Sequence, residues 1–586
     1  MLCQVSGRSP RSGVEFEVIL EGQSVDRDPG VSPEAVRLRS EPPRGRRGVG
    51  RYTTAARSGG TTPTAHPTGR SPLTTRRIRG PLSGAVARLC TELRGGVGAT
   101  AASGLDEVLH RLGEPLQLAV VGRIKSGKST LVNALIGRNV APTDVGECTR
   151  VVTRFRYGTV DRVEVVLRDG DRRSLPFTPE GAIPAELGVE RERVSHLEVY
   201  LTNEVLRDLT VIDTPGLGST DDSSVSRTEV VLGGSGGEPD DRLDPVSRSA
   251  VARAEAVLYV VTQSVRADDR HALSSFGAAT GDRPAGPVNA LAVLNKVDTV
   301  EPESVREGDG TVWNSAELLA GRQARQLKPR VADVLPVIGL LAETAETGVF
   351  TASDAEALRR LAELDAGTRQ TMLISADLFT SWECDVPSGT RTRLLELLDL
   401  YGVRRALEAV DADPGITAGG LRRVLHESSG LSEVSRGLDT IFRSRADGIK
   451  AAAGLASVAA VAQRSGDPAE RGRIHDAVEA LLAQPGAHQL RLLEALTLVS
   501  AGEVKLPPDL LDEVLRLGSS DNPAERLGML DGSPERMVEF ALERANWWRS
   551  FASLGSTPAQ SRVAHVVHRA YFLLWQQLRG GPNARR

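Results

Sequence analysis

One eight-residue segment constrains the fold of this chain more than any other feature. Residues 122–129 read Gly-Arg-Ile-Lys-Ser-Gly-Lys-Ser, which is a complete G-x-x-x-x-G-K-S phosphate-binding loop. An apolar run at 118–121 precedes the loop, and an apolar-periodic run at 131–136 follows it. This order predicts a strand, a glycine-rich loop and a helix, in which backbone N–H groups and the helix N-terminus face phosphate oxygens.

The residues of this loop have separate expected roles. We expect Lys128 to reach the β- and γ-phosphates and Ser129 to bind Mg²⁺. The remaining residues expected to contact the nucleotide are Gly122, Arg123, Ile124, Lys125, Ser126, Gly127 and Thr130. The alternative is a glycine turn in an ordinary α/β unit, and two further motifs argue against it.

The second motif, Asp213-Thr214-Pro215-Gly216, ends the apolar run 209–212. A D-x-x-G pattern places a carboxylate near Mg²⁺ and a glycine amide near the γ-phosphate. We therefore expect Asp213 in the second shell of the metal and Gly216 at the γ-phosphate. No Gln follows Gly216, so backbone groups are expected to position the attacking water and basal turnover is expected to be slow.

The third motif, Asn295-Lys296-Val297-Asp298, follows the apolar run 290–294. An N-K-x-D pattern selects guanine because its Asp accepts hydrogen bonds from the ring N1–H and the exocyclic N2–H₂, and adenine offers neither donor there. The three motifs occur in the order found in GTPases, each at the C-terminal end of a strand, where open α/β sheets bind ligands. The sequence thus predicts GTP and Mg²⁺ as ligands.

Bulk properties exclude several classes of protein. At 586 residues the chain should hold more than one domain, and its net charge of −4 argues against a nucleic-acid partner. The four cysteines are scattered, which favours reduced thiols over a disulfide framework or a zinc site. No apolar run approaches the ~18 residues of a membrane span, and no secretory signal is evident. Any membrane contact is therefore expected to be peripheral.

Composition divides the chain into four parts. Residues 1–80 are rich in Arg, Ser, Thr, Pro and Gly and are expected to be disordered. A basic arm for acidic lipid or nucleic acid is one interpretation of them, and a spurious extension or solvated tail is the favoured one. Residues 81–115 predict two neck helices packed on distant sequence. A nucleotide-binding domain is expected over 116–385, and helices throughout 386–586.

The expected fold class is α/β. A P-loop head with a mostly parallel, doubly wound sheet should carry an α-helical bundle. Strand patterns in the head, besides those before the motifs, are at 151–157, 162–167, 196–201, 256–261 and 334–339. We prefer 334–342 over Ser375-Ala376 as the loop that contacts the base. In the helical part, we expect a helix interrupted at Tyr401-Gly402.

Residues 141–153, Ala-Pro-Thr-Asp-Val-Gly-Glu-Cys-Thr-Arg-Val-Val-Thr, resemble the first switch of the dynamin superfamily. Together with 122–130 and 335–345, they make the chain similar to actinobacterial dynamin-like GTPases, including the isoniazid-inducible type. The resemblance implies that Thr149 closes on Mg²⁺ and the γ-phosphate. It also makes 116–385 a dynamin-type GTPase domain and 386–586 its stalk.

The resemblance carries further expectations about partners. It implies a large, low-affinity GTPase that self-associates through its heads and remodels membranes with a helical bundle whose tip meets lipid. It also implies a paralogous dynamin-like partner. With the absence of a membrane span, it predicts a cytoplasmic protein, peripheral at the inner face of the cell membrane on anionic lipid. The alternative function is a regulatory GTP switch that acts on a protein partner without membrane contact.

The phosphate loop departs from eukaryotic dynamins at Ile124-Lys125, where those proteins carry Gln-Ser. In dynamins these positions align water and hold a monovalent cation. We hypothesise that Lys125 replaces this cation and stabilises charge developing on the β–γ bridging oxygen. The alternative is that Lys125 points to solvent or to a carboxylate of the partner head.

Two segments are candidates for lipid contact. Residues 448–462 are small and apolar and are consistent with a lipid-facing loop, but such residues more often form a closely packed helix seam. Trp547-Trp548, flanked by Arg544 and Arg549, could anchor at an interface, but aromatic residues at helical spacing more often belong to a core.

Overall fold

The computed structural model describes most of the chain from residue 80 onward. The described residues are 80–142, 151–215, 254–263, 289–300, 311–328, 330–500, 502–519, 522–553 and 556–580. The basic segment expected to be disordered, residues 1–80, lies outside this part of the structure except for its last residue.

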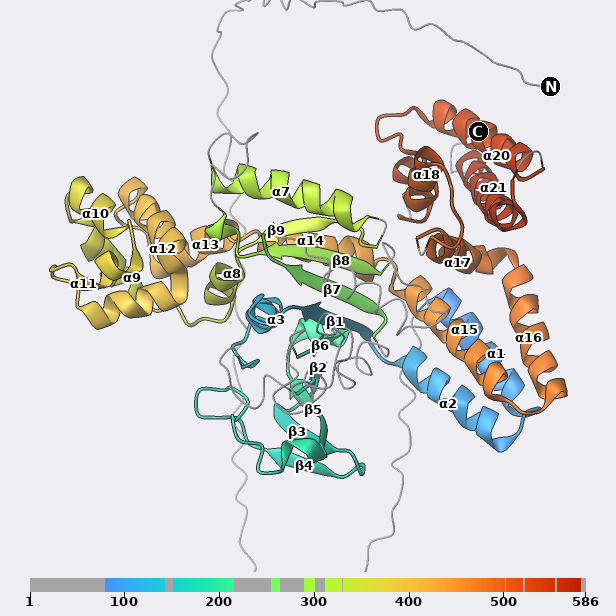
Figure 1. Ribbon diagram of the computed structural model, residues 1–586, viewed down its shortest axis with the longest axis horizontal. Helices are drawn as coiled ribbons and strands as arrows, with labels where there is room; N and C mark the ends of the chain where they lie inside the picture. The colour runs from blue at the N-terminus through green and yellow to red at the C-terminus, as the bar shows by residue number, and fades with distance from the viewer. Residues whose placement is uncertain are drawn as a thin grey trace, which may run out of the picture. The chain divides into compact units, whose positions relative to one another are not determined.

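A nine-stranded mixed sheet forms the centre of the head (Figure 1). Its order is β4-β3-β5-β2-β6-β1-β7-β8-β9. The pairs of β1 with β6 and β7, β7 with β8, β8 with β9, and β2 with β5 are parallel, and the pairs β2–β6, β3–β4 and β3–β5 are antiparallel. The strands are β1 (Leu116–Gly122), β2 (Thr153–Tyr157), β3 (Arg162–Leu167), β4 (Arg172–Leu175), β5 (Val194–Leu201), β6 (Leu209–Asp213), β7 (Ala256–Val261), β8 (Ala290–Asn295) and β9 (Val334–Val337). The mostly parallel sheet predicted for the head is confirmed.

The central strands owe their position to uninterrupted apolar sequence. Every residue of β1, β7 and β8 is buried, as expected for parallel strands covered on both faces. Their parallel register brings the ends of β1, β6 and β8 to one edge of the sheet. Gly122, Asp213 and Asn295 are the last residues of these three strands, so the three motifs meet there.

The helices of the head continue beyond the expected domain boundary. They are α3 (Lys128–Ile136), α7 (Val312–Leu327), α8 (Gly339–Glu346), α9 (Ala352–Ala362), α10 (Ala366–Met372), α11 (Ala376–Ser381), α12 (Ser388–Ala412), α13 (Ala418–Glu427) and α14 (Leu431–Leu438). Helix α12 packs on α8 and α9, α13 packs on α8, and α14 packs on β8 and β9. Contacts with the head therefore run to Leu438, and the division at 385/386 stays a prediction.

The interruption of α12 is not where the sequence predicted it. The non-helical residue is Asp399, with φ 52° and ψ 177°, and not the pair Tyr401-Gly402. Gly402 is helical, and a Cβ there would overlap the side chain of Leu341 on α8. Glycine at this position therefore serves the close approach of two helices and does not break one.

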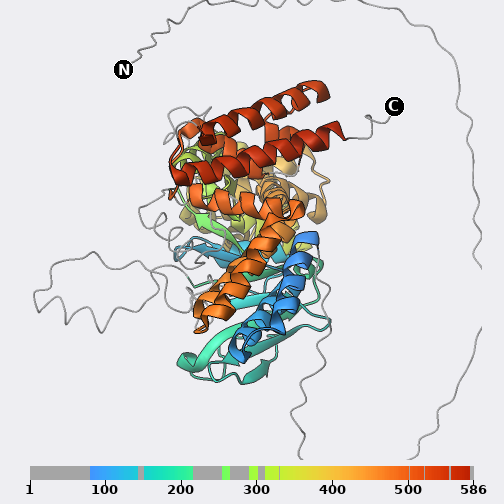
Figure 2. The same cartoon turned by 90° about the vertical axis from the view of Figure 1, so that its right-hand side faces the viewer.

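The remaining helices form a separate all-α region. They are α1 (Pro81–Arg94), α2 (Ala99–Gly113), α15 (Ala446–Arg464), α16 (Pro468–Ala483), α17 (His488–Ser500), α18 (Pro508–Ser519), α19 (Pro523–Leu527), α20 (Pro534–Ser553) and α21 (Pro558–Arg579), and the π-helix η6 (Asp439–Arg443) links them to α14. Helices α1 and α2 pack against α15, more than 300 residues away in sequence (Figure 2). Asp447 at the start of α15 accepts hydrogen bonds from the backbone N–H groups of Leu82 and Ser83, both at 2.9 Å.

The two candidates for lipid contact have different outcomes. Helix α15 is largely buried, and a Cβ on Gly454 would lie only 3.1 Å from Leu112 and 3.3 Å from Val86. Residues 448–462 are thus a helix seam, and the lipid-facing interpretation is wrong for this conformation. Trp548 is fully buried, whereas Trp547 is 39% exposed and stacks on Phe551. Of the helices that the structure describes, none is long and apolar enough to cross a membrane.

Candidate nucleotide site

The phosphate loop joins the end of β1 to the start of α3. The Lys128 side chain is buried, and its Nζ donates a hydrogen bond to the carbonyl of Arg123 at 2.9 Å across the loop. Burial lowers the pKa of Lys128, and the negative charge of Asp213 opposes that shift. The buried Ser126 hydroxyl has no hydrogen-bond partner among the residues that the structure describes. Lys125 adopts a left-handed backbone with φ 62° and is exposed.

Two glycines of the loop are required by close approaches of the backbone. Gly127 has φ 84°, and a Cβ there would overlap the side-chain nitrogen of Asn295. A Cβ on Gly122 would lie 2.5 Å from the carbonyl oxygen of Val260. Any other residue at either position would displace a neighbouring loop or strand.

Asp213 lies beside the start of α3 and provides the acidic group of the site. Its Oδ2 accepts a hydrogen bond from the Ser129 hydroxyl at 2.8 Å, and its Oδ1 is buried without a hydrogen-bond partner among the described residues. Burial raises the pKa of Asp213, and the nearby Lys128 ammonium counters this shift. A hydroxyl oxygen beside an unsatisfied carboxylate oxygen suits a hard cation such as Mg²⁺, so these two residues fit the metal that a phosphate loop requires.

Asn295 connects three loops of the site. Its Nδ2 donates to the carbonyl of Ser126 at 2.8 Å, and its Oδ1 accepts from the N–H groups of Lys296 at 2.8 Å and Gly339 at 2.9 Å. The side chain is buried, and its polar atoms bind protein groups. Asn295, expected to select guanine, thus holds three loops of the site together through its side chain.

Asp298 is the middle residue of the short 3₁₀ turn η4 (Val297–Thr299), which follows Lys296. Burial raises the pKa of Asp298, and the carboxylate of Asp399 adds to this effect. Asp399 is the non-helical residue of α12, and no local sequence pattern predicts its position near the base-recognition motif. Beside it, Trp313 Nε1 donates to the Tyr401 hydroxyl at 3.0 Å.

The two candidate base-contacting loops have different surroundings, and the choice between them stays a prediction. Gly339, in the preferred segment 334–342, is hydrogen-bonded to Asn295. Ser375, the rival, caps α11 by accepting a hydrogen bond from the Leu378 N–H at 3.2 Å. Two other predicted site residues, Thr149 and Gly216, lie outside the described residues.

Sequence reasoning missed a buried pair beside the loop helix. Asn133 on α3 accepts hydrogen bonds from the N–H groups of Val140 and Ala141, at 3.0 and 2.7 Å. Its Nδ2 donates to Glu343 Oε1 at 2.7 Å. Burial raises the pKa of Glu343 to about 7, although the hydrogen bond from Asn133 opposes the shift. The pair thus anchors the chain where it enters the segment that carries Thr149.

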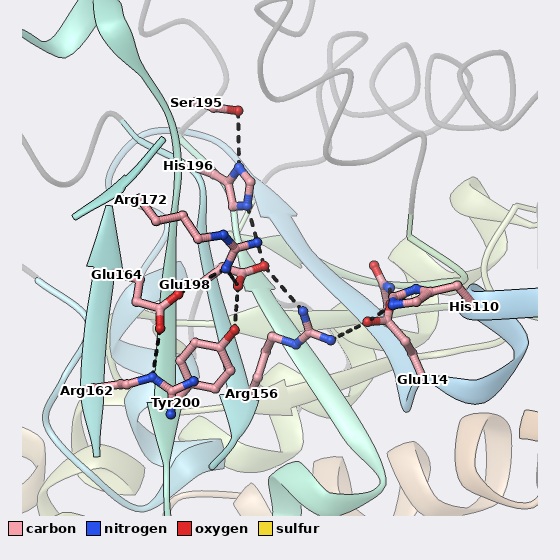
Figure 3. Close-up of polar contacts among 11 residues, drawn as sticks. His110, Glu114, Arg156, Arg162, Glu164, Arg172, Ser195, His196, Glu198 and Tyr200 are labelled. Carbon is pink, nitrogen blue, oxygen red and sulfur yellow. Dashed lines mark hydrogen bonds and ion pairs between the residues drawn. The ribbon is translucent and has the colours of Figure 1, made fainter. Parts of the chain in front are cut away.

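A polar network covers the outer strands of the sheet (Figure 3). Glu198 on β5 accepts hydrogen bonds from Arg156 on β2 at 3.3 Å, from Arg172 on β4 at 2.9 Å and from the Tyr200 hydroxyl at 2.6 Å. Arg156 also pairs with Glu114 at the end of α2. Burial disfavours the ionised form of Glu198, but its neighbours together hold its pKa well below the usual range. The network ties β2 and β5 to the neck helix.

Comparison with known proteins decides the family. The model of the Dynamin family matches residues 118–297. The chain is 33% identical over 457 residues to the isoniazid-induced protein IniC of Mycobacterium tuberculosis, covering 77% of this chain and 87% of that protein. The chain belongs to the dynamin family. This dynamin-like GTPase therefore hydrolyses GTP.

A more distant relative agrees with this assignment. The dynamin-like GTPase is 25% identical over 311 residues to the bacterial dynamin-like protein of Nostoc punctiforme, covering 50% of this chain and 40% of that protein. A solved structure described as an oligomerised bacterial dynamin pair aligns with 84% of this chain and 90% of its own, at 14% identity and a TM-score of 0.28. A likeness of that size has no bearing on the fold or the function.

Proposed function

We propose that this dynamin-like GTPase hydrolyses GTP with a Mg²⁺ ion held by Ser129 and Thr149, with Asp213 in its second shell, and that hydrolysis drives membrane remodelling by the helical region. The observation that carries the metal role is the hydrogen bond of 2.8 Å between Ser129 and Asp213. Beside it lies a buried carboxylate oxygen that has no partner in the part of the chain that the structure describes. Mg²⁺ supplies charge neutralisation at the β- and γ-phosphates when bound.

The protein groups around the phosphates have the following proposed roles. Lys128 and the amides of the loop bind the β- and γ-phosphates, and Gly216 contacts the γ-phosphate. The nucleotide would displace the hydrogen bond that Lys128 now makes to the Arg123 carbonyl. Asp298 accepts from the guanine N1–H and N2–H₂, and Asn295 and Lys296 hold the loops around the base.

Lys125 is proposed to stabilise the charge that develops on the β–γ bridging oxygen, in place of a monovalent cation. Its exposed side chain has no hydrogen-bond or ion-pair partner among the described residues, and its left-handed backbone lies within the phosphate loop. We expect Lys125→Ala to lower kcat by about 10²-fold, the loss typical of one transition-state donor. Unchanged kcat in Lys125→Ala, or a wild-type rate that depends on potassium, would show that the proposal is wrong.

Contact with other proteins and with lipid is the second part of the proposal. Ile124 is 49% exposed within the phosphate loop, which supports association of two heads over their nucleotide sites. Leu530 is 73% exposed between α19 and α20, and Trp547 lies on α20 with the Arg544 guanidinium over its ring. We propose that these two side chains enter the interface of an anionic membrane. A paralogous dynamin-like protein is the proposed partner.

GTP hydrolysis measured with and without anionic liposomes, across protein concentration, tests this function in the full chain. We expect liposomes to stimulate turnover, more steeply as protein concentration rises. The double variant Leu530→Ser/Trp547→Ser should keep its basal rate and lose this stimulation, whereas Ile374→Ser, an equally exposed apolar residue of the head, should not. A slow rate that responds to neither lipid nor concentration would favour the regulatory switch.

A further inference from the structure

A cavity of about 200 Å³ lies inside the helical region, away from the nucleotide site. It opens at the N-terminus of α17, between the C-terminal ends of α18 and α21 and the residues that precede α15. Its lining consists of Arg445, Gly448, Gly486, His488, Gln489, Leu492, Leu493, Leu517, Gly518, Arg526, Ala570, Leu573, Leu574 and Gln577. By this measure one water needs about 10–15 Å³, so the cavity can hold a group much larger than a water molecule.

The charge of the lining has one sign. Arg445 and Arg526 contribute guanidinium groups, and no Asp or Glu is among the described residues that line the cavity. Arg445 is more than nine-tenths buried. The first turn of α17, a helix of 13 residues, adds backbone N–H groups and the positive end of the helix dipole. The whole chain carries a net charge of −4, so a lining whose charged side chains are all positive does not follow from its overall composition.

His488 responds to this positive field. Its Nε2 is buried and has no hydrogen-bond partner within the described ranges, while the ring is hydrogen-bonded to the backbone of Val566. Burial lowers the pKa of His488 to about 4, and the charges of Arg569 on α21, Arg526 on α19 and Arg491 on α17 add to the shift. The ring is therefore neutral at physiological pH. Because the hydrogen bond to the Val566 backbone raises the pKa, the ring donates it, and Nε2 of the neutral ring is an acceptor that a bound anion would favour protonating.

We propose that this cavity binds a phosphate group. Guanidinium groups match the oxygens of phosphate in geometry and charge, and a helix N-terminus supplies further donors. One wall is apolar, formed by Leu492, Leu573 and Leu574, which suits a phosphate ester that carries an apolar substituent. The phosphate can belong to a phospholipid head group or to a free phosphate compound. This site does not depend on the proposed function of the nucleotide site.

The first experiment uses the full chain saturated with GDP, so that the phosphate loop is occupied. Inorganic phosphate is titrated while the His488 ring is followed by NMR, assigned by comparison with His488→Gln. We expect saturable binding and a rise of at least one unit in the pKa of His488, because an anion offsets the arginine charges. Arg526→Gln should weaken binding at least tenfold. Arg536→Gln, an exposed arginine of α20 paired with Glu539, is the matched control and should bind as the wild type.

The second experiment identifies the source of the phosphate. Co-sedimentation is measured with phosphatidylcholine vesicles, with and without phosphatidic acid. Binding to phosphatidic acid that Arg526→Gln loses and Arg536→Gln keeps assigns the site to a lipid head group. If inorganic phosphate binds, but Arg526→Gln co-sediments with vesicles to the same extent as the wild type, the site is assigned to a free phosphate compound. If His488 does not respond to phosphate, or if Arg526→Gln folds normally by circular dichroism and binds phosphate as the wild type, the proposal is wrong.

Discussion

Asn295 joins three loops of the proposed nucleotide site through a single side chain. Asn295→Ala would remove its hydrogen bonds to Ser126, Lys296 and Gly339 and leave their buried partners unsatisfied. Each unsatisfied buried group costs about 1–3 kcal/mol, so we expect unfolding free energy to fall by several kcal/mol and GDP affinity to fall with it. Urea denaturation and fluorescent GDP binding measure the two effects.

The matched variant for this prediction is Asn295→Asp. A carboxylate still accepts from Lys296 and Gly339 but cannot donate to the Ser126 carbonyl, so its loss should be intermediate. If Asn295→Ala binds GDP as tightly as the wild type, the tethering role is wrong.

Glu343 makes stability depend on pH. Because its pKa is raised to about 7 from 4.5 in the unfolded chain, the folded protein binds the proton more tightly, and stability falls as pH rises from about 4.5 to 7. Glu343→Gln keeps an acceptor for Asn133 and carries no charge. At pH 8 it should be more stable than the wild type by roughly 2–3 kcal/mol, and near pH 4 the two should be equal. Urea denaturation at several pH values tests this, and a constant difference would contradict it.

At the scale of a single element, helix α12 carries a strained residue next to the base-recognition motif. Asp399 has a backbone conformation that favours glycine, at a cost of about 1–3 kcal/mol for other residues. Its side chain recovers part of this cost by accepting the Leu400 N–H at 2.5 Å. Both Asp399→Gly and Asp399→Ala lose this hydrogen bond, but only the Ala variant keeps the backbone strain. We therefore expect Asp399→Gly to be about 1 kcal/mol more stable than Asp399→Ala. Thermal unfolding compares them, and equal midpoints would mean that α12 relaxes without cost.

At the scale of the whole molecule, one buried ion pair joins the helical region to the head. Lys450 on α15 lies 3.4 Å from Glu255, which precedes β7, and donates to the Arg111 carbonyl at 2.9 Å. Glu255 also accepts the backbone N–H of Gln117 on β1 at 3.2 Å. Three distant parts of the sequence therefore meet at two side chains.

Removing one partner of this pair should cost more than removing both. Lys450→Met leaves the Glu255 charge buried, which typically costs about 3–5 kcal/mol. The double variant Lys450→Met/Glu255→Gln removes both charges and should recover much of the lost stability. Chemical denaturation of the wild type, Lys450→Met, Glu255→Gln and the double variant gives the coupling free energy between the two side chains. Additive effects would show that the two charges do not interact.

The sequence by itself determined the nucleotide chemistry and most of the elements. The three motifs are local, so each specifies a turn at the end of a strand regardless of what packs around it. The strands before these motifs and the helices α1, α2 and α16–α21 follow from apolar runs and helical periodicity. The strand β4 escaped prediction because its four residues, Arg172–Leu175, are mostly exposed and carry no apolar pattern.

For residues whose sequence pattern fits more than one structural role, only the tertiary structure decided which role they have. Asn133 and Glu343 are 210 positions apart, and no local pattern connects them. The sequence predicted a helix break at Gly402, but the break is at Asp399. Glycine is needed at position 402 because Leu341 packs against it. The small residues of α15 suit lipid or a helix seam equally, and the burial of Gly454 against Val86 and Leu112 decides between them. The reason is physical: burial and long-range hydrogen bonds depend on partners that the chain supplies only once it is folded.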